Sequence, residues 1–524
     1  MNRQDAKAAK RIDSTELRLK RLSTCARSSF CVFPCDSVGA FFSNFVCVRL
    51  RSSAVALLFA LVGCTTVGPD YKRPEVVKPE AFRFQVTEAR ELANVAWWQQ
   101  FNDPVLAGLI DDALANNRDL RVAAARVEEF AGRLTTTRSQ ALPQLGYGAG
   151  ASRDRVSERL DTPVGGLPNP QTTYQAFLSA SWEIDLWGRI RRLSEAAQAD
   201  LYATEEARRG VVLTLVSAVA TGYILLRDLD KQLEIARSTA GTREEAVKLF
   251  DLRFKGGVVS QVELAQVTSE YEAAAAAIPA GERAVAQAEN ALAVLLGRNP
   301  GAIARGRAID ELAIPGVPAG LPSDLLERRP DIRQSEQNLI GANARIGAAR
   351  ALYFPTISLT GLLGTASAAF GNLFSGPARM WSYAGSLSGP IFTGGSIEGT
   401  VAQAEAQQKQ LLATYERAIQ NAFREVDDAL IDQLKSRERL AAQGRQVAAL
   451  RDYARLSKAR YEGGYSSYLE VLDAERSLFS AELGYAQTQF DLFNALVNVY
   501  KAMGGGWVDE ADKLAPKPVV ELSR

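Results

Sequence analysis

The segments Phe254-Lys-Gly-Gly-Val-Val-Ser-Gln-Val-Glu263 and Tyr461-Glu-Gly-Gly-Tyr-Ser-Ser-Tyr-Leu-Glu470 match each other at a shift of 207 residues. The same shift aligns Trp187-Gly188 with Gly394-Gly395. A shift that stays constant over more than about a hundred residues indicates a duplicated unit without insertions in this region.

Each copy predicts two antiparallel helices joined by a tight turn at the Gly-Gly pair. Tyr415, Ile419 and Phe423 begin an apolar stripe at helical spacing before the second turn. After the turns, Ser260-x-x-Glu263 and Ser467-x-x-Glu470 have the pattern of a capping box, which starts a new helix. The repeated element is therefore predicted to be a helical hairpin.

The lengths of the helical segments predict how they pack. Gly188 to Phe254 and Gly395 to Tyr461 are each 67 residues long, which corresponds to about 100 Å of α-helix. We expect the first to lie beside two shorter helices stacked end to end, 261–297 and 323–351. We expect the second to lie beside 467–503 and the first helix of the chain, which begins at Asp103-Pro104 and runs to about residue 140.

Four segments alternate between apolar and small or polar residues, and each is predicted to be a β-strand. They begin at Leu145, Ala176, Ile357 and Trp381. Such alternation suits the wall of a transmembrane barrel, although an ordinary soluble sheet would fit strands this short equally well. Four strands cannot close a barrel, and lipid does not tolerate an open sheet edge, so a barrel would require several chains to combine their strands.

A signal segment is predicted before Cys64. Arg49 and Arg51 form a basic start, and the apolar stretch from Ala54 to Val62 is too short to span a bilayer of about 30 Å. Leu61-Val-Gly-Cys64 resembles a bacterial lipoprotein box, which predicts cleavage before Cys64 and acylation of its sulfur. The alternative is an ordinary signal peptide followed by an unrelated cysteine. The membrane anchor favours the barrel interpretation of the strands.

Residues 1–47 are expected to be a wrongly assigned start, because a start at residue 48 would leave a normal signal peptide. They contain four of the five cysteines, whose spacing fits no zinc pattern. The other boundaries that we predict are a lipid-anchored linker over 64–102, two repeats over 103–300 and 301–507, and a C-terminal tail over 508–524.

Composition argues against several functional classes. Lys plus Arg is 61 and Asp plus Glu is 60, so no basic excess indicates nucleic acid. The chain has no histidine, which removes the commonest general base and metal ligand. It also lacks a nucleophile elbow and a glycine-rich phosphate loop. We therefore expect no enzyme activity, no metal, and no cofactor other than a covalent lipid on Cys64.

These motifs together resemble the TolC-like outer-membrane efflux family, in particular the lipoprotein channels of resistance-nodulation-division (RND) pumps. The resemblance covers nearly all of residues 64–507. Besides the lipoprotein box and the Gly-Gly turns, it rests on Trp97-Trp98, Leu321-Pro-Ser-Asp-Leu-Leu-Glu-Arg-Arg-Pro-Asp331, Leu469-Glu-Val-Leu-Asp-Ala-Glu475 and Tyr500-Lys-Ala-Met-Gly504.

The resemblance implies a mainly α fold with β-strands. Three chains would form a twelve-stranded transmembrane β-barrel, four strands per chain, that continues into a long periplasmic α-helical barrel. The protein would lie in the outer membrane, anchored by lipid, and would pass small molecules from an inner-membrane RND pump and a periplasmic adaptor. The alternatives are a lipid-anchored periplasmic coiled-coil scaffold and the exit duct of a type I secretion system.

The resemblance also places a periplasmic gate at the turns. By position, the gate residues are expected to be Glu263, Arg460, Tyr461, Leu469, Glu470 and Asp473, and the adaptor is expected to dock on Gly256, Gly257, Gly463 and Gly464. Both glutamates could instead be simple helix caps, and Leu469 could be a packing residue. Asp473 has no such local role, so it ranks first, with Arg460 and Tyr461 as the expected partners of the gate carboxylates.

Overall fold

A computed structural model of the chain describes residues 66–76, 79–84, 96–157, 159, 169–317 and 322–519. The chain divides into two units, Met1–Gly63 and Cys64–Arg524, and every described residue belongs to the second. The predicted signal segment and Cys64 therefore lie outside the described residues.

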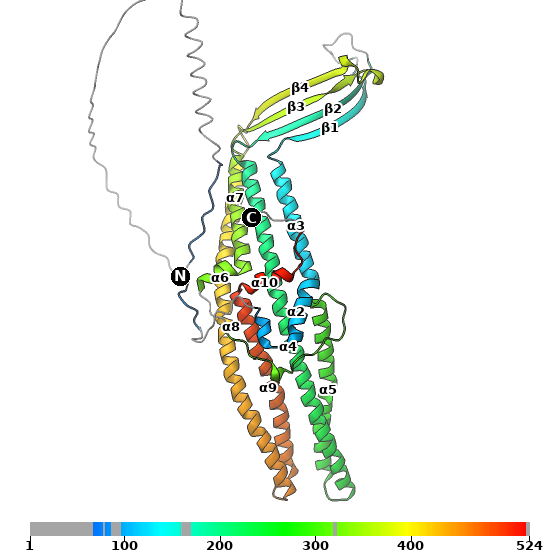
Figure 1. The fold of residues 1–524 in the computed structure, drawn as a ribbon, viewed down its shortest axis with the longest axis vertical. Coiled ribbons are helices and arrows are strands. Elements are labelled where there is room, and N and C mark those ends of the chain that lie inside the picture. Colours follow the sequence, from blue (N-terminus) through cyan, green and yellow to red (C-terminus); the bar gives the residue numbers. More distant parts are fainter. Residues whose placement is uncertain are drawn as a thin grey trace, which may run out of the picture. The chain divides into compact units, whose positions relative to one another are not determined.

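Two helical hairpins form the body of the second unit (Figure 1). In the first hairpin, α4 (Arg189–Lys255) turns into α5 (Gln261–Leu295). In the second, α8 (Ser396–Glu462) turns into α9 (Tyr468–Met503). Both long helices contain 67 residues, as predicted. The middle of α4 is apolar and long enough to cross a membrane, but half of that stretch is buried against neighbouring elements.

The partners of the long helices were only partly predicted. As expected, α4 lies against both α5 and α7 (Pro330–Ala351). The expected helix over 323–351 is broken, because α6 (Pro322–Arg328) ends before Pro330, which has no backbone N–H to continue it. α8 packs on α9 and also on α7.

The first helix is also broken and lies elsewhere than expected. It divides at Asn117 into α2 (Pro104–Asn116) and α3 (Arg118–Ser139), because the side chain of Asn117 caps the second part. α3 packs against α4 within the chain, so the prediction that it lies beside α8 is wrong for a single protomer.

The four predicted strands form one antiparallel sheet in the order β1-β2-β3-β4: β1 (Gln144–Asp154), β2 (Gln171–Ile184), β3 (Thr356–Ser367) and β4 (Arg379–Ser388). Between β3 and β4 lie the 3-10 turns η3 (Phe370–Asn372) and η4 (Gly376–Ala378). The register aligns Tyr147, Leu178, Leu363 and Trp381 directly across the strands, so they share one face. All four side chains are exposed in the single chain. This apolar row, together with the free edges of β1 and β4, is the pattern of a barrel segment rather than of a closed sheet.

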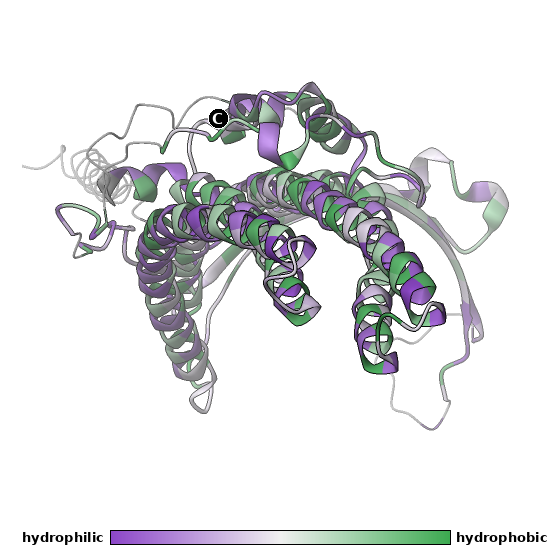
Figure 2. Ribbon diagram, turned by 90° about the horizontal axis from the view of Figure 1, so that it is seen from below, coloured by the Kyte–Doolittle hydropathy of each residue, from purple (hydrophilic) through white to green (hydrophobic). Residues whose placement is uncertain are grey.

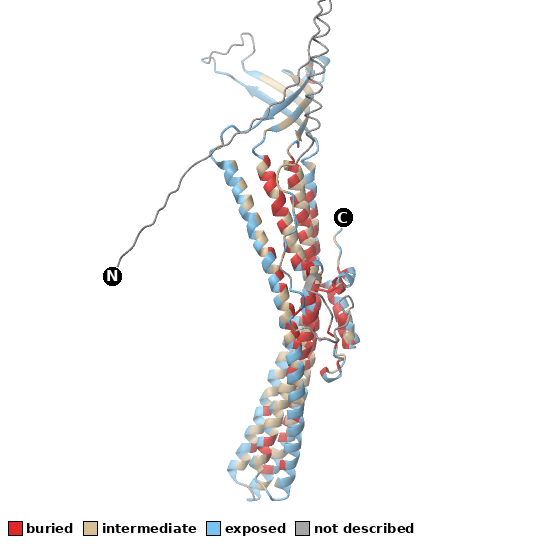
Figure 3. Cartoon of the chain, turned by 90° about the vertical axis from the view of Figure 1, so that its left-hand side faces the viewer, coloured by how far each residue is buried: buried red, intermediate tan, exposed pale blue. Residues whose placement is uncertain are grey.

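A buried group packs against the middle of α4 and the C-terminal part of α9. It comprises η1 (Trp97–Phe101), α2, the turn η2 (Ile309–Glu311) and α10 (Trp507–Leu514). The Trp97 ring stacks on Tyr500 with ring centres 5.3 Å apart and meets Trp507 edge-on. Burial is concentrated here and in the sheet-proximal half of the helices, and it falls toward the glycine turns (Figure 3).

Asp103 joins this group to the long helices. Its carboxylate is almost fully buried and accepts hydrogen bonds from the backbone N–H of Val105, as the predicted cap of α2, and from the Tyr223 hydroxyl of α4. It also accepts from the backbone N–H of Arg307 in the loop between α5 and η2. Gly306 allows this approach, because a Cβ there would lie only 2.1 Å from an Asp103 oxygen.

Candidate functional site

The two Gly-Gly turns close the hairpins as predicted. Gly257 and Gly464 have φ of 70° and 75°, a region that favours glycine. In each turn the backbone N–H of the residue after the second glycine donates a 2.9 Å hydrogen bond to a carbonyl near the end of the preceding helix. Val258 donates to Arg253, and Tyr465 donates to Arg460, which is the pattern of a Schellman cap. A Cβ on Gly257 or Gly464 would meet nothing within 4 Å, so both tips are open. Figure 2 views the helices from this end.

The two predicted capping boxes behave differently. Ser260 and Glu263 form both bonds of the box at the start of α5. Ser467 makes no side-chain cap, so the second prediction is wrong. Glu470 is instead 3.6 Å from Arg460 across the turn, because that cation offers its carboxylate a charged partner. Glu263 thus has a structural role, and Glu470 has the ion pair with Arg460 that was expected of the gate.

Asp473 also has a local partner, contrary to the sequence argument. It accepts a 2.9 Å hydrogen bond from Arg476, one turn along the same helix. Leu469 is 59% exposed, which excludes the packing interpretation within one protomer. Leu469, Glu470 and Asp473 all line one open pocket between α5 and α9, of about 640 Å³. The structure therefore brings together four of the six predicted gate residues: these three in the pocket, and Arg460 through its contact with Glu470.

Tyr461 binds a cation rather than a carboxylate. Its hydroxyl accepts a 2.6 Å hydrogen bond from Arg253 of α4, which joins the two hairpins near their tips. Its ring lies against Phe250 and Tyr468. Arg253 was not among the predicted gate residues, although the sequence holds a signal for it: the shift of 207 residues makes it the equivalent of Arg460.

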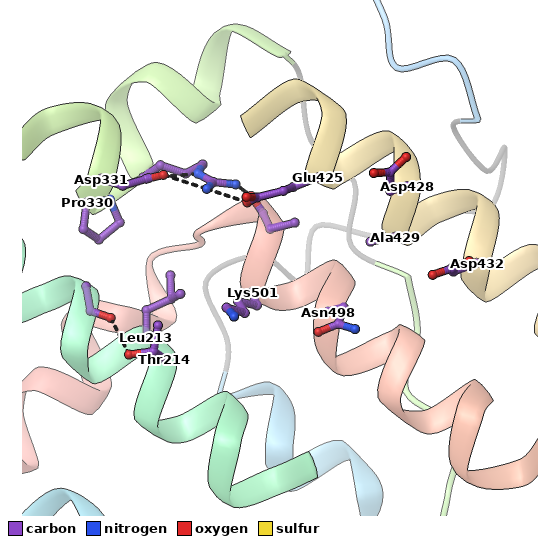
Figure 4. A pocket seen from close by; sticks show the side chains of 13 residues that line it. Leu213, Thr214, Pro330, Asp331, Glu425, Asp428, Ala429, Asp432, Asn498 and Lys501 are labelled. Atoms are coloured by element: carbon purple, nitrogen blue, oxygen red, sulfur yellow. Dashed lines mark hydrogen bonds and ion pairs between the residues drawn. The ribbon is translucent and has the colours of Figure 1, made fainter. Parts of the chain in front are cut away.

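A second polar pocket, of about 450 Å³, lies where α7 begins and α9 ends (Figure 4). Arg329 is largely buried there and donates to the carbonyl of Ala502, to Asp331 and to Glu425. Asp428, Asp432 and Lys501 also line the pocket. The Arg-Arg-Pro-Asp motif therefore has a physical function, which is to join the end of α9 to the start of α7 and to the side of α8.

The residues that follow Cys64 are held at the sheet end of α4. The N–H of Val67 donates to the carbonyl of Trp187, and Arg192 binds Asp70 at 2.7 Å. Gly68, with φ of 108°, lies against Gly347 of α7, where a Cβ would be only 2.3 Å from the Gly347 Cα. Lipid on Cys64 remains a prediction, since that residue is outside the described part. Among the described residues, no cluster of three metal-ligating side chains is present.

Comparison with known proteins identifies the chain's relatives. The family model described as outer membrane efflux protein matches residues 109–298 and 321–505. The solvent efflux pump outer membrane protein SrpC of Pseudomonas putida is 38% identical over 470 residues, which cover 88% of this chain and 99% of that protein. The cation efflux system protein CusC of Escherichia coli is 37% identical over 473 residues, with the same coverage.

Solved structures agree with the sequence comparison. The open state of the MtrE outer membrane channel of Neisseria gonorrhoeae superimposes with a TM-score of 0.76 at 35% identity, covering 84% of this chain and 99% of that one. A crystal structure of CusC gives a TM-score of 0.75 at 34% identity, covering 84% and 100%. Both the fold class and the outer-membrane location predicted from the sequence are thereby confirmed.

Proposed function

This chain belongs to the outer membrane efflux protein family, whose members are transport channels, and on that premise we propose that it is the exit duct of a tripartite efflux complex. Its expected partners are a periplasmic adaptor and an inner-membrane RND pump. The observation that carries the proposal is the combination, in one chain, of an apolar-faced sheet and two long hairpins with open glycine tips.

The sheet supports assembly as a homotrimer. β1 and β4 are edge strands, and unpaired edges are not stable in lipid. Three copies of a four-stranded sheet would give twelve strands, enough to close a barrel in which β1 of one chain pairs with β4 of the next. The same symmetry would place α3 of one protomer close to α8 of another, and so provide the neighbour that α8 lacks within the chain.

The passage is proposed to be polar and weakly selective. On α4, Val212 and Val216 are buried in the core, whereas Thr214 is exposed on the other side and lines the pocket of Figure 4. Carboxylates of α8 line the same pocket. A hydrated, charged wall suits the passage of small molecules of varied chemistry, as the relatives' names indicate for solvents and cations. Substrate choice would then be made by the pump.

The gate is proposed to lie at the tips. The contacts between charged or polar groups at this end of the protomer include Arg253 with Tyr461 between the hairpins, and Arg460 with Glu470 across one turn. An adaptor that docks on the exposed glycine turns would shift the population toward an open state if it binds that state more tightly.

Purified protein in mild detergent tests the proposal. Light scattering should give trimers without a folded monomer, and planar bilayers should show a low closed-state conductance that Tyr461→Phe raises. Asp473→Ala should have a smaller effect, because its partner is on its own helix. A stable monomeric barrel would refute the assembly. If the Tyr461→Phe trimers are intact and their closed-state conductance equals that of the wild type, the gate does not lie at the tips.

A further inference from the structure

One buried carboxyl group lies on the seam between the hairpins, far from the tips. Asp228 of α4 is 0% exposed. Its Oδ2 accepts a hydrogen bond from Gln232 on the same helix at 2.8 Å, and its Oδ1 has no hydrogen-bond partner. A buried carboxylate with an unsatisfied oxygen is unfavourable unless it is neutralised or hydrated.

Among the described residues, no cation is bonded to Asp228, whose carboxylate accepts one hydrogen bond, from Gln232. On α9, the charge that acts on Asp228 is Asp491, which is itself bound to Arg439 of α8. From η2, Asp310 is bound to Lys231, and from α5, Glu289 is bound to Arg305. The electrostatic influence on Asp228 is therefore a like charge, and an ionised Asp228 would be both desolvated and repelled by Asp491.

The position of Asp228 along the seam is also distinctive. Above it, toward the sheet, Thr221 of α4 hydrogen-bonds Asn494 of α9, and the apolar core fills the seam. On the other side of Asp228, toward the tips, the seam contains open pockets. Two pockets of about 460 and 250 Å³, lined by residues of α4, α8 and α9, follow one another toward the tips. Asp228 thus lies where close packing gives way to an open groove with polar lining residues.

We propose that Asp228 is a second gating residue, a proton-dependent hinge at which the lower parts of the two hairpins separate. When the carboxyl group is protonated, the seam stays dry and closed. When it is ionised, the closed seam holds an uncompensated charge beside Asp491, and opening relieves this by letting water reach both groups. The inference rests on the channel function proposed above.

The direction and size of the effect follow from burial. Burial, and secondarily Asp491, raise the pKa of Asp228 from 3.8 to about 6 in the closed seam. An open, hydrated seam would return the pKa toward its ordinary value, so the closed state is favoured at low pH and loses that advantage between about pH 4 and pH 6. A difference of about two pKa units corresponds to about a hundredfold change in the closed-to-open ratio per protomer.

The experiment measures the seam directly. Spin labels on cysteines introduced at Gly241 of α4 and Ala442 of α8, both exposed, report the distance between the hairpins in trimers shown to conduct in planar bilayers. The wild type should shift toward longer distances as the pH rises from 4 to 7. Asp228→Asn, and Asp228→Ser as a smaller second variant, should keep the low-pH distribution throughout. Asp251→Asn, the same change at a carboxylate of the same helix whose side chain is 41% exposed, is the matched control and should show the wild-type shift with pH.

Three results would overturn the proposal: a wild-type distance that does not change with pH, Asp228 variants whose distance changes with pH as in the wild type, or an Asp251→Asn variant whose distance does not change with pH. Because only conducting trimers are measured, each of these would leave the channel function intact.

Discussion

Replacement of Arg329 by alanine should destabilise the protein by about 3 kcal/mol, whereas the same change at the adjacent Arg328 should have little effect. The two arginines share one motif but differ in environment. Arg329 is largely buried at the junction of α7 and α9, and Arg328 lies on the surface of α6 with Asp324 as its ion-pair partner at 3.2 Å.

The magnitude follows from the bonds of Arg329. Its Nη1 donates to the carbonyl of Ala502 at 2.9 Å, a buried bond to a charged donor that is worth about 1.5–3 kcal/mol. Its other nitrogens bind Asp331 and Glu425, each at 2.7 Å. These carboxylates are 50% and 44% exposed, so water screens them and each contributes less than about 1 kcal/mol. The total is near the lower end of the roughly 3–5 kcal/mol found when one partner of a buried ion pair is removed.

Thermal dissociation of the trimer, followed by gel mobility and circular dichroism, would measure the difference. The stability of Arg329→Lys should lie between those of the wild type and Arg329→Ala, because lysine keeps the charge but cannot donate to Asp331 from two nitrogens. Equal shifts for Arg329→Ala and Arg328→Ala would show that burial at this junction does not determine the stability.

Three further predictions concern other parts of the chain. Labelled palmitate should enter the wild type and not Cys64→Ser, and label that persists in the variant would contradict acylation at this residue. Burial opposes ionisation of Asp512, but hydrogen bonds from Arg208 and Lys517 hold the pKa of its carboxyl group below 3.8. The stability that the ionised carboxylate contributes near neutral pH should therefore be lost as the pH falls through that lowered pKa. Trp507 fluorescence should show this step in the wild type and not in Asp512→Asn. Gly68→Val should weaken the docking of the N-terminal segment on Gly347, so that protease cuts there sooner than in Gly371→Val, where a Cβ meets nothing within 4 Å.

Local signals in the sequence were sufficient for the strands and the hairpin turns, but they did not predict the breaks in the helices at Asn117 and Arg329. The period-two alternation located the strands, and the glycines located the turns to within a residue, because both depend on short-range backbone geometry. Predictions about partners were less reliable. Ser467 and Glu470 have the spacing of a capping box, yet Glu470 pairs with Arg460 and the box does not form. Local sequence does not show which of two competing partners is nearer in space.

The hinge and the inter-hairpin contact were not predicted for the same reason. Nothing in the sequence around Asp228 marks it as buried, since its burial depends on the register of α4 against α9. Arg253 and Tyr461 are separated by 208 residues, and only the folded hairpins bring them together.

The equal lengths of α4 and α8 restrict how this architecture can change in size. An insertion in one of them alone would leave one hairpin tip projecting beyond the other and would shift every facing side chain around the helix. Growth or shortening would therefore have to occur in both repeats together, in whole helical turns, and in the antiparallel partners as well. The breaks at Asn117 and Arg329 are free of this restriction, because extra residues there bulge outward without changing the distance from sheet to tip. We expect relatives to differ in the number of residues that bulge outward at these breaks, whereas the distance from the sheet to the tips stays the same.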